Sequence, residues 1–387
     1  MRIKPSNRLG EVKEYYFSRK LREIAAMRNK GIDVINLGIG SPDLPASEAV
    51  VEALKAGCST EKAHQYQGYA GIPALKTGFS NWYNKYYQVE LNPTNEILPL
   101  IGSKEGIMHI SMAFLNEGDQ VLVPNPGYPT YSSATHLAGG ESVYYFLKEE
   151  NDWQPDFEAL EQLDLTKVKI MWVNYPHMPT GANATMDLFE KLVAFGRKHE
   201  ILICNDNPYS FILNDKPMSI LSVEGAKDIA LELNSLSKSH NMAGWRMGMV
   251  AGHSDYIQTI LRFKSNMDSG MFKPIQLAAT EALALPQSWY DELNAIYKKR
   301  QKVVYELYDL LGCTYDDSRG GMFVWGKVPA QYENGYALSD QLLEKSHVFI
   351  TPGGIFGSQG EGYIRASLCS EISIFETAIE RIKSRFK

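Results

Sequence analysis

The chain has 387 residues, of which 44% are hydrophobic and 22% charged, and its formal net charge is −6 at pH 7. This composition is ordinary for a soluble globular protein, and the acidic balance gives no electrostatic footprint for nucleic acid. The first residues lack an apolar signal core, no run is long enough to span a membrane, and the four scattered cysteines show no metal or redox spacing. We therefore expect a cytoplasmic protein that binds neither nucleic acid nor membrane.

Apolar strands alternate with amphipathic helices along most of the chain. Helices are expected at 14–29, 104–115 and 187–199, and strands at 34–37, 96–101, 120–123, 142–147, 168–173 and 201–205. Continuous apolar strands separated by helices indicate a mostly parallel sheet with helices on both faces, which is an α/β fold. Such sheets bind ligands beyond the carboxyl ends of their strands.

The pattern changes after Pro286. A long polar helix is expected at 289–311, followed by an apolar strand, Met322–Trp325, and by further helix and strand. The chain is also longer than one hydrophobic core usually supports. We therefore expect an N-terminal arm that joins the small domain (1–44), a large domain (45–285) and a smaller α+β domain (286–387).

The segment Gly102–Gly106 follows a predicted strand and opens a helix. Backbone N–H groups at a helix start attract anions, and Ser103 and Lys104 stand at that start. Together with Ser235 and Arg246, further along the chain, they form a candidate phosphate cradle. The alternative for Ser103 is an ordinary helix cap, which is common.

The turn Asn125–Tyr131 follows another predicted strand. Its prolines and glycine fix the backbone, so that the ring of Tyr128 can project over a flat heterocycle. The alternative is a tyrosine that packs on the core.

Asp206 ends the apolar strand 201–205, and Tyr209 follows three residues later. A carboxylate in that place suits a protonated ring nitrogen, because a neighbouring opposite charge shifts a pKa by about 1–3 units towards the ionised form. The hydroxyl of Tyr209 suits an oxygen on the same ring. The alternatives are a turn aspartate and a half-buried tyrosine.

Lys238 lies in the most informative segment, Ser235–Arg246, directly after an apolar stretch. Small hydroxyl residues flank the lysine, and an arginine follows eight positions later. This grouping suits an imine between the lysine and an aldehyde cofactor whose phosphate is held by hydroxyls and a guanidinium, as in pyridoxal phosphate chemistry. The alternative is a solvated loop lysine.

Arg365 lies inside the strand-like segment Tyr363–Ser367. A guanidinium binds a carboxylate through two parallel hydrogen bonds. A substrate carboxylate is therefore one interpretation of Arg365, and a structural ion pair is the other.

Two glycine patterns do not predict nucleotide binding. Gly38–Gly40 lacks the third glycine of a dinucleotide fingerprint, and Gly321–Lys327 contains a core strand and lacks the Ser/Thr of a P-loop. The eight histidines show no zinc-binding pattern, and we assign no metal.

Taken in order, these segments resemble the class I/II aminotransferases of pyridoxal phosphate fold type I, the aspartate aminotransferase-like enzymes, over nearly the whole chain. The motif Ser-x-Ser-Lys…Gly-Trp-Arg at 235–246 is the most specific match. The stacking-tyrosine turn, the Asp-x-x-Tyr pair, Pro352–Gly357 and Arg365 also match. The resemblance implies the fold, the cofactor pyridoxal 5'-phosphate and amino-acid and 2-oxo-acid substrates.

The resemblance also implies a homodimer with active sites at the subunit interface. Tyr66 opens a Tyr…Gly-Ile-Pro-x-Leu segment that ends at Leu75. In similar proteins this tyrosine reaches the cofactor phosphate of the neighbouring subunit. Gly40 falls where the family's Gly-x-Pro-Asp loop contacts the substrate carboxylate.

One departure from the family pattern is Met178, where the family usually has the asparagine of Asn-Pro-Thr-Gly. That asparagine donates to the ring oxygen, and a thioether cannot donate. Tyr209 alone carries the contact, or Asn174 or His177 supplies a substitute, or the imine has a different pKa. We place Asn174 among the substrate-binding residues, with Gly40 and Arg365.

The leading hypothesis is reversible transamination between an L-amino acid and a 2-oxo acid through a pyridoxal phosphate Schiff base at Lys238. A β-lyase that acts on a sulfur amino acid on the same scaffold is the alternative. A third possibility is a non-catalytic sensor of the cofactor or of an amino acid. Acidic, aromatic and diaminopimelate-type substrates all remain open.

Overall fold

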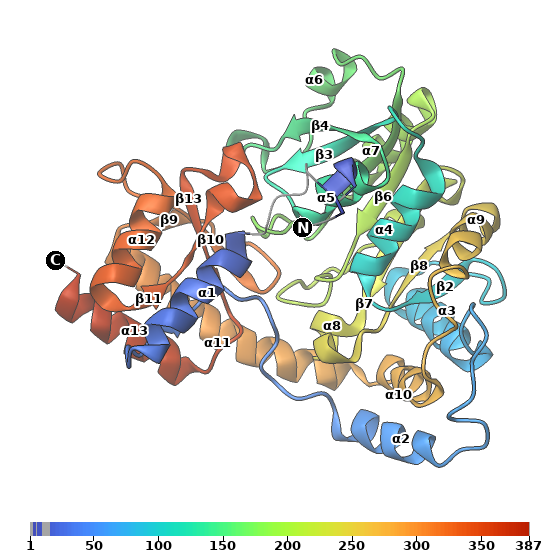
Figure 1. The fold of residues 1–387 in the computed structure, drawn as a ribbon, viewed down its shortest axis with the longest axis horizontal. Helices are drawn as coiled ribbons and strands as arrows, with labels where there is room; N and C mark the ends of the chain where they lie inside the picture. Colours follow the sequence, from blue (N-terminus) through green and yellow to red (C-terminus); the bar gives the residue numbers. More distant parts are fainter. Residues whose placement is uncertain (1–2, 5, 10–15, 387) are drawn as a thin grey trace.

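A seven-stranded sheet forms the centre of the larger of two lobes (Figure 1). The computed structural model describes residues 3–4, 6–9 and 16–386. Across the sheet the strands are ordered β2 (Ile97–Leu100), β8 (Gly248–Gly252), β7 (Ala230–Ser235), β6 (Leu202–Asp206), β5 (Val168–Val173), β3 (Gln120–Asn125) and β4 (Glu141–Phe146). Only β8 runs antiparallel to its neighbours, so the predicted mostly parallel sheet is confirmed.

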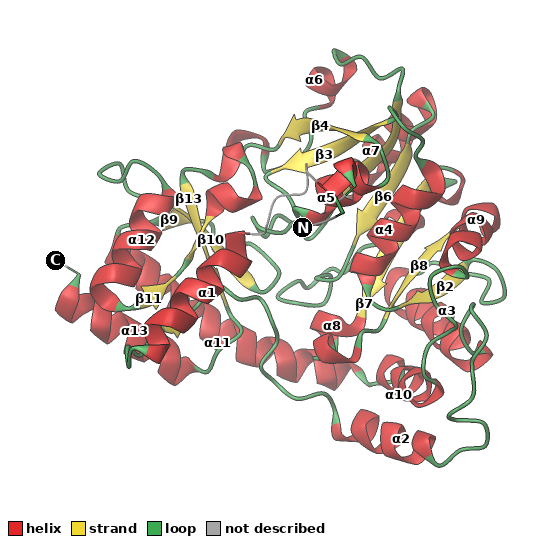
Figure 2. Ribbon diagram, in the orientation of Figure 1, coloured by secondary structure: helices red, strands yellow, loops and turns green. Residues whose placement is uncertain are grey.

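Both faces of this sheet are buried under helices (Figure 2). Alternate residues of β5 enter different hydrophobic cores: Ile170 and Trp172 face one, and Met171 and Val173 face the other. This alternation explains why residues 170–173 of the strand are all apolar. The first core is covered by α4 (Ser103–Phe114), α5 (Thr130–Leu137) and α9 (Ser254–Lys264), and the second by α3 (Pro73–Tyr87), α7 (Met186–His199) and α10 (Lys273–Leu283).

The smaller lobe contains an antiparallel sheet with the order β12 (Thr351–Pro352), β13 (Tyr363–Ser367), β10 (Phe323–Lys327) and β9 (Thr314–Tyr315). The parallel pair β1 (Ile35–Asn36) and β11 (Val348–Phe349) joins the N-terminal segment to this lobe. The helices of this lobe are α1 (Tyr16–Asn29), α12 (Gly335–Ser346) and α13 (Ile372–Arg385). The long helix α11 (Gln287–Leu311) runs from the larger lobe into the smaller one (Figure 1).

Several predicted elements differ from the structure in their bounds, and one strand of the large sheet was not predicted. The helix expected from residue 14 is seen from Tyr16, because residues 14–15 lie outside the described part of the chain. Strand β8 was not predicted, because it is short and glycine stands at both of its ends. Ser103 is the first residue of α4 rather than its cap, and Gly102 takes the cap position with φ +84°, a backbone conformation that favours glycine.

Within the described residues, no helix combines the length and the apolar character needed to cross a membrane. The remaining α-helices of the described residues are α2 (Glu48–Cys58), α6 (Phe157–Glu161) and α8 (Leu236–Ser239). Helix α8 carries Lys238 and directly follows β7, so the predicted order of strand and lysine is confirmed.

Candidate active site

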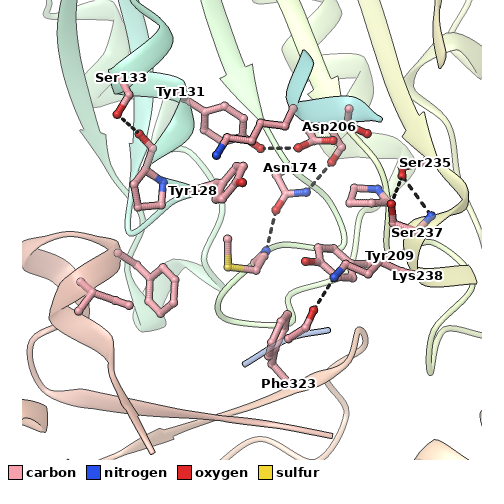
Figure 3. Close-up of a pocket in the computed structure, with 18 of the residues that line it drawn as sticks. Tyr128, Tyr131, Ser133, Asn174, Asp206, Tyr209, Ser235, Ser237, Lys238 and Phe323 are labelled. Atoms are coloured by element: carbon pink, nitrogen blue, oxygen red, sulfur yellow. Dashed lines mark hydrogen bonds between the residues drawn. The ribbon is translucent and has the colours of Figure 1, made fainter. Parts of the chain in front are cut away.

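A cavity of about 860 Å³ lies at the carboxyl ends of the large-sheet strands, and residues of the smaller lobe close its other side (Figure 3). Every predicted site residue except Tyr66 lines it. These residues are Gly40, Ser103, Lys104, Tyr128, Asn174, Asp206, Tyr209, Ser235, Lys238, Arg246 and Arg365. They come from seven separate segments, and the fold gathers them because parallel strands end at the same edge.

Asp206 ends β6 and is buried at the floor of the cavity. Its Oδ2 accepts a hydrogen bond of 3.1 Å from the hydroxyl of Tyr131, while Oδ1 has no hydrogen-bond partner among the described residues. Burial raises the pKa of this carboxyl to about 7, although the Tyr131 hydroxyl pulls in the opposite direction. An unsatisfied carboxylate oxygen with a raised pKa is suited to a cationic N–H donor.

The amine of Lys238 enters the cavity from α8 and donates a hydrogen bond to the backbone oxygen of Gly40 (Figure 3). Burial lowers the pKa of this amine, and the positive charges of Arg365 and Arg246 act in the same direction. A lowered pKa increases the neutral fraction, which is the form that attacks a carbonyl or accepts a proton.

The start of α4 and the segment after β7 form one end of the cavity. A Cβ on Gly102 would lie 2.2 Å from Nη2 of Arg246, so only glycine permits this close approach. Nη2 of Arg246 donates to the backbone oxygen of Ile101 at 3.2 Å. The hydroxyl of Ser235 accepts from the N–H of Ser237 and lies 2.7 Å from its hydroxyl. Two hydroxyls, a guanidinium and a helix start thus converge, as a phosphate requires.

Tyr128 and Tyr131 stand one turn apart where β3 meets α5. Their rings meet edge to face at 5.7 Å, and Tyr131 stacks on Trp172 at 5.1 Å with an angle of 6° between the rings. The ring of Tyr128 is partly buried and lines the cavity. Tyr131 therefore positions two site residues: it holds Tyr128 through an edge-to-face ring contact and Asp206 through a hydrogen bond.

Arg365 lies on β13 and is buried between two aromatic rings. Its guanidinium carbon is 3.9 Å from the ring centre of Phe323 and 4.5 Å from that of Phe356. Nη2 donates to the backbone oxygen of Gly38 at 3.0 Å. Burial lowers the pKa of this guanidinium to about 10, which still leaves it charged at neutral pH.

The loop Gly38–Asp43 contacts two basic groups of the site, because the backbone oxygens of Gly38 and Gly40 accept hydrogen bonds from Arg365 and Lys238, respectively. Asp43 fixes the end of this loop through two hydrogen bonds of 2.7 Å with Arg300 on α11. A bidentate pair of this kind holds a loop in one orientation.

The residues around Met178 are arranged by Asn174. The amide nitrogen of Asn174 donates to the backbone oxygen of Asp206, and its amide oxygen accepts from the N–H of Met178 at 2.8 Å. The Met178 sulfur lies 3.1 Å from Nη1 of Arg365. The His177 ring does not line the cavity and faces Thr180 at 2.8 Å. Of the predicted substitutes for the asparagine, Tyr209 and Asn174 therefore lie at the cavity and His177 does not.

Tyr66 is 91% exposed and does not line the cavity of its own chain.

The residues that sequence reasoning missed include Tyr131, Ser237 and Phe323, all of which line the cavity. Ser237 was visible in the Ser-x-Ser-Lys motif. For Tyr131 and Phe323 no local signal existed, since each looks like a core aromatic.

A family model for "Aminotransferase class I and II" matches residues 32–382. The chain belongs to the class I and II aminotransferases. The LL-diaminopimelate aminotransferase of Nitratidesulfovibrio vulgaris is 41% identical over 98% of both chains. The solved structure of apo-BacF from Bacillus subtilis is 37% identical, with a TM-score of 0.95 over 99% of this chain and 98% of that one. A probable N-succinyldiaminopimelate aminotransferase from Thermus thermophilus is 30% identical, with a TM-score of 0.89 over 95% and 99%.

This aminotransferase depends on pyridoxal phosphate and moves an amino group between an L-amino acid and a 2-oxo acid. The predicted fold type, cofactor and reaction class are confirmed, and neither the β-lyase nor the non-catalytic sensor is favoured. The residues present fit the cofactor, because the cavity combines a half-buried lysine, an unsatisfied Asp206 oxygen and a glycine–arginine cradle.

Proposed function

We propose that LL-diaminopimelate is the amino donor of this aminotransferase. Curated relatives from several bacteria carry the name LL-diaminopimelate aminotransferase, at 38–41% identity over 98% of this chain. The cavity supports this choice, because it continues past Tyr128 to polar side chains of α5 and β4, among them Ser132, Ser133 and Tyr144. A donor with a second amino and carboxyl group needs hydrogen-bonding groups at the far end of its site.

We propose the following roles for the chain's own groups. Pyridoxal phosphate, when bound, supplies an aldehyde that condenses with amines and a ring that withdraws electrons from the substrate's α carbon. Asp206 holds the ring nitrogen protonated, and Tyr209 contacts the ring oxygen. Lys238 anchors the cofactor and later moves the proton from the α carbon. The buried position of its amine and its lowered pKa support the role of base.

The remaining proposed roles concern binding. Tyr128 stacks on the cofactor ring, and the phosphate is held by Ser103, Lys104, Ser235 and Arg246. The substrate carboxylate is held by Arg365, with Gly40 and Asn174 beside it. The support is that all of these side chains or backbone groups line one cavity.

We also propose a homodimer in which Tyr66 of the partner subunit completes the phosphate site, since Tyr66 is exposed in a single chain. We propose domain boundaries at residues 44 and 285, supported by the separation of the seven-stranded sheet from the two sheets of the smaller lobe. A cytoplasmic location is proposed because all four cysteines are free thiols.

An amino-donor panel with 2-oxoglutarate as acceptor tests the substrate. We expect kcat/KM for LL-diaminopimelate to exceed that for aspartate, phenylalanine and N-succinyl-diaminopimelate by at least about 100-fold. Aspartate and phenylalanine leave the polar groups at the far end unpaired, whereas the succinyl group removes the charge of the distal amine and adds bulk beside it. The meso stereoisomer is the matched control for recognition of the distal centre. A higher kcat/KM for phenylalanine or aspartate would contradict the assignment.

A further inference from the structure

A group of charged side chains lies behind the phosphate cradle and outside the cavity. Glu105 and His109 are one turn apart on α4, with His109 Nε2 2.9 Å from Glu105 Oε1. Lys264 ends α9 and is completely buried, and its Nζ lies 2.6 Å from Oδ2 of Asp268. Ligand atoms of Glu105, His109 and Asp268 all lie within 4.8 Å of one another. We call these four residues the support cluster.

The support cluster carries its own positive charge. Burial alone would raise the pKa of Asp268, but hydrogen bonds from Lys264 and from the N–H of Gly270 hold it below its usual value. The ammonium of Lys264 thus keeps the Asp268 carboxylate ionised inside the protein. The buried ammonium of Lys264 therefore balances the charge of one of the two neighbouring carboxylates, that of Asp268, and the two form a buried ion pair.

On one side the support cluster reaches the phosphate cradle. Oε2 of Glu105 accepts the backbone N–H of Ile101. The backbone oxygen of Ile101 accepts a hydrogen bond of 3.2 Å from Nη2 of Arg246. Ile101 is therefore held from both sides, by Glu105 through its N–H and by Arg246 through its carbonyl. A shift of Glu105 would displace the carbonyl that orients Arg246.

On the other side the support cluster reaches the exposed segment that begins with Tyr66. Oδ1 of Asp268 accepts the N–H of Gly270 at 2.9 Å. Gly270 packs so closely on this segment that a Cβ would lie 2.5 Å from the backbone oxygen of Gln67 and 3.0 Å from that of Gly68. Asp268 thus fixes the surface on which the residues next to Tyr66 rest.

We propose that the support cluster positions both halves of the phosphate site. Glu105 is a positioning residue that acts on the cofactor phosphate through Ile101 and Arg246. Asp268 and Lys264 link this residue to the segment that presents Tyr66 to the partner subunit. The inference rests on the proposed phosphate roles of Arg246 and Tyr66, and it adds that one buried network sets the geometry of both.

The test is a titration of the cofactor-free protein with pyridoxal phosphate. We expect Glu105→Ala to raise the cofactor dissociation constant about tenfold, the size of one lost charge-assisted hydrogen bond, with kcat at saturating cofactor unchanged. Glu105→Gln keeps an oxygen for Ile101 and restores most of the affinity. The matched control is Glu96→Ala, because Glu96 likewise accepts a backbone N–H and pairs with a basic side chain, which is Lys227 at 2.8 Å.

Amide hydrogen exchange of the cofactor-free protein gives a second measurement. We expect the Ile101 amide to exchange faster in Glu105→Ala, and the amide of Gly270 to exchange faster in Asp268→Asn. If Glu105→Ala does not fold, Asp268→Asn takes its place in the cofactor titration. Unchanged cofactor affinity in the folded variant, or equal losses in Glu105→Ala and Glu105→Gln, would overturn the inference.

Two further variants separate this inference from the proposed function. The titration uses no amino donor, so it is independent of the diaminopimelate assignment. Arg246→Ala in the same titration tests the proposed phosphate role itself, which is wrong if the affinity stays unchanged. A double variant tests the link to Tyr66. We expect the loss of cofactor-binding free energy in Tyr66→Phe/Asp268→Asn to be smaller than the sum of the losses in the two single variants. Additive effects would overturn that link.

Discussion

The sulfur of Met178 lies 3.1 Å from Nη1 of Arg365, so a thioether stands beside the arginine where the motif resemblance predicts an asparagine amide. A thioether is a weak acceptor and has no donor. In the proposed arrangement, the ring oxygen of the cofactor would therefore have one donor fewer at this position. The backbone of Met178 is nevertheless held by Asn174, which fixes the loop independently of the side chain.

Met178→Asn restores the amide, and we expect it to lower the spectroscopic pKa of the bound cofactor by about one unit. A hydrogen bond to a charged group contributes about 1.5–3 kcal/mol, and one pKa unit corresponds to about 1.4 kcal/mol. Absorbance titration of the holoenzyme measures this pKa. Met178→Leu removes the sulfur without adding a donor, so it leaves the pKa in place. A pKa that does not move in Met178→Asn would show that Tyr209 already satisfies the ring oxygen.

Lys238→Ala removes the amine that lies against Gly40, and we expect turnover to fall by at least about 10²–10⁴-fold, the usual contribution of a positioned acid–base group. Steady-state kinetics measure the loss, and borohydride reduction followed by peptide mapping identifies the lysine that holds the cofactor. Lys55→Ala is the control, because Lys55 is exposed and pairs only with Glu52 among the described residues. A trapped peptide from any other lysine would refute the assignment.

Arg365→Lys keeps the charge between Phe323 and Phe356 but loses the planar fork. We expect kcat/KM to fall about 10–100-fold, mainly through KM, since one charge-assisted hydrogen bond to the substrate carboxylate is lost. Arg381→Lys is the control in the same lobe, where Arg381 pairs with the exposed Asp33. An unchanged KM would place the substrate carboxylate elsewhere in the cavity.

Asp206 gives a pH dependence whose sign follows from its pKa. The folded cofactor-free protein holds this pKa near 7, against about 3.9 in an unfolded chain. The stability that this raised pKa contributes is fully present below about pH 4 and is lost as the pH rises through 7. Relative to Asp206→Asn, we therefore expect the unfolding free energy of the cofactor-free wild type to decrease by about 1.4 kcal/mol per pH unit in that window.

Chemical denaturation of both proteins between pH 5 and 8 measures this difference. The control is the same measurement with saturating pyridoxal phosphate. A cationic ring nitrogen beside Oδ1 would favour the ionised carboxylate, and the decrease of the unfolding free energy with pH would disappear. A difference between the two proteins that stays constant with pH would mean that Asp206 is already ionised in the cofactor-free protein.

The sequence pattern places candidate site residues correctly at one cavity where polar side chains coincide with strand ends. Asp206, Ser235 and Lys238 stand at the ends of apolar strands, and parallel strands bring their ends together, so the periodic pattern alone places them at one edge. The sheet was predicted for the same reason, except for β8. That strand has only five residues with glycine at both ends, which gives it no periodic signal.

The supporting residues could not be predicted from local pattern. Tyr131 bonds Asp206, which is 75 residues away in the chain, and Phe323 covers Arg365 across the small sheet. Such pairs depend on tertiary packing, and each aromatic looks like any core residue in its own segment. The support cluster joins α4 to the segment after α9 in the same way, so its residues read as ordinary surface charges until the helices are packed together.

The stacked pair of Tyr131 and Trp172 also provides an optical reporter. Trp172 is completely buried, and its indole lies against the tyrosine whose hydroxyl bonds Asp206. Pyridoxal phosphate bound at that carboxylate would lie close to the indole and would quench its fluorescence by energy transfer. The fluorescence of Trp172 would therefore decrease as the cofactor binds. The chain has six tryptophans, and Trp172→Phe would show how much of the fluorescence change comes from Trp172.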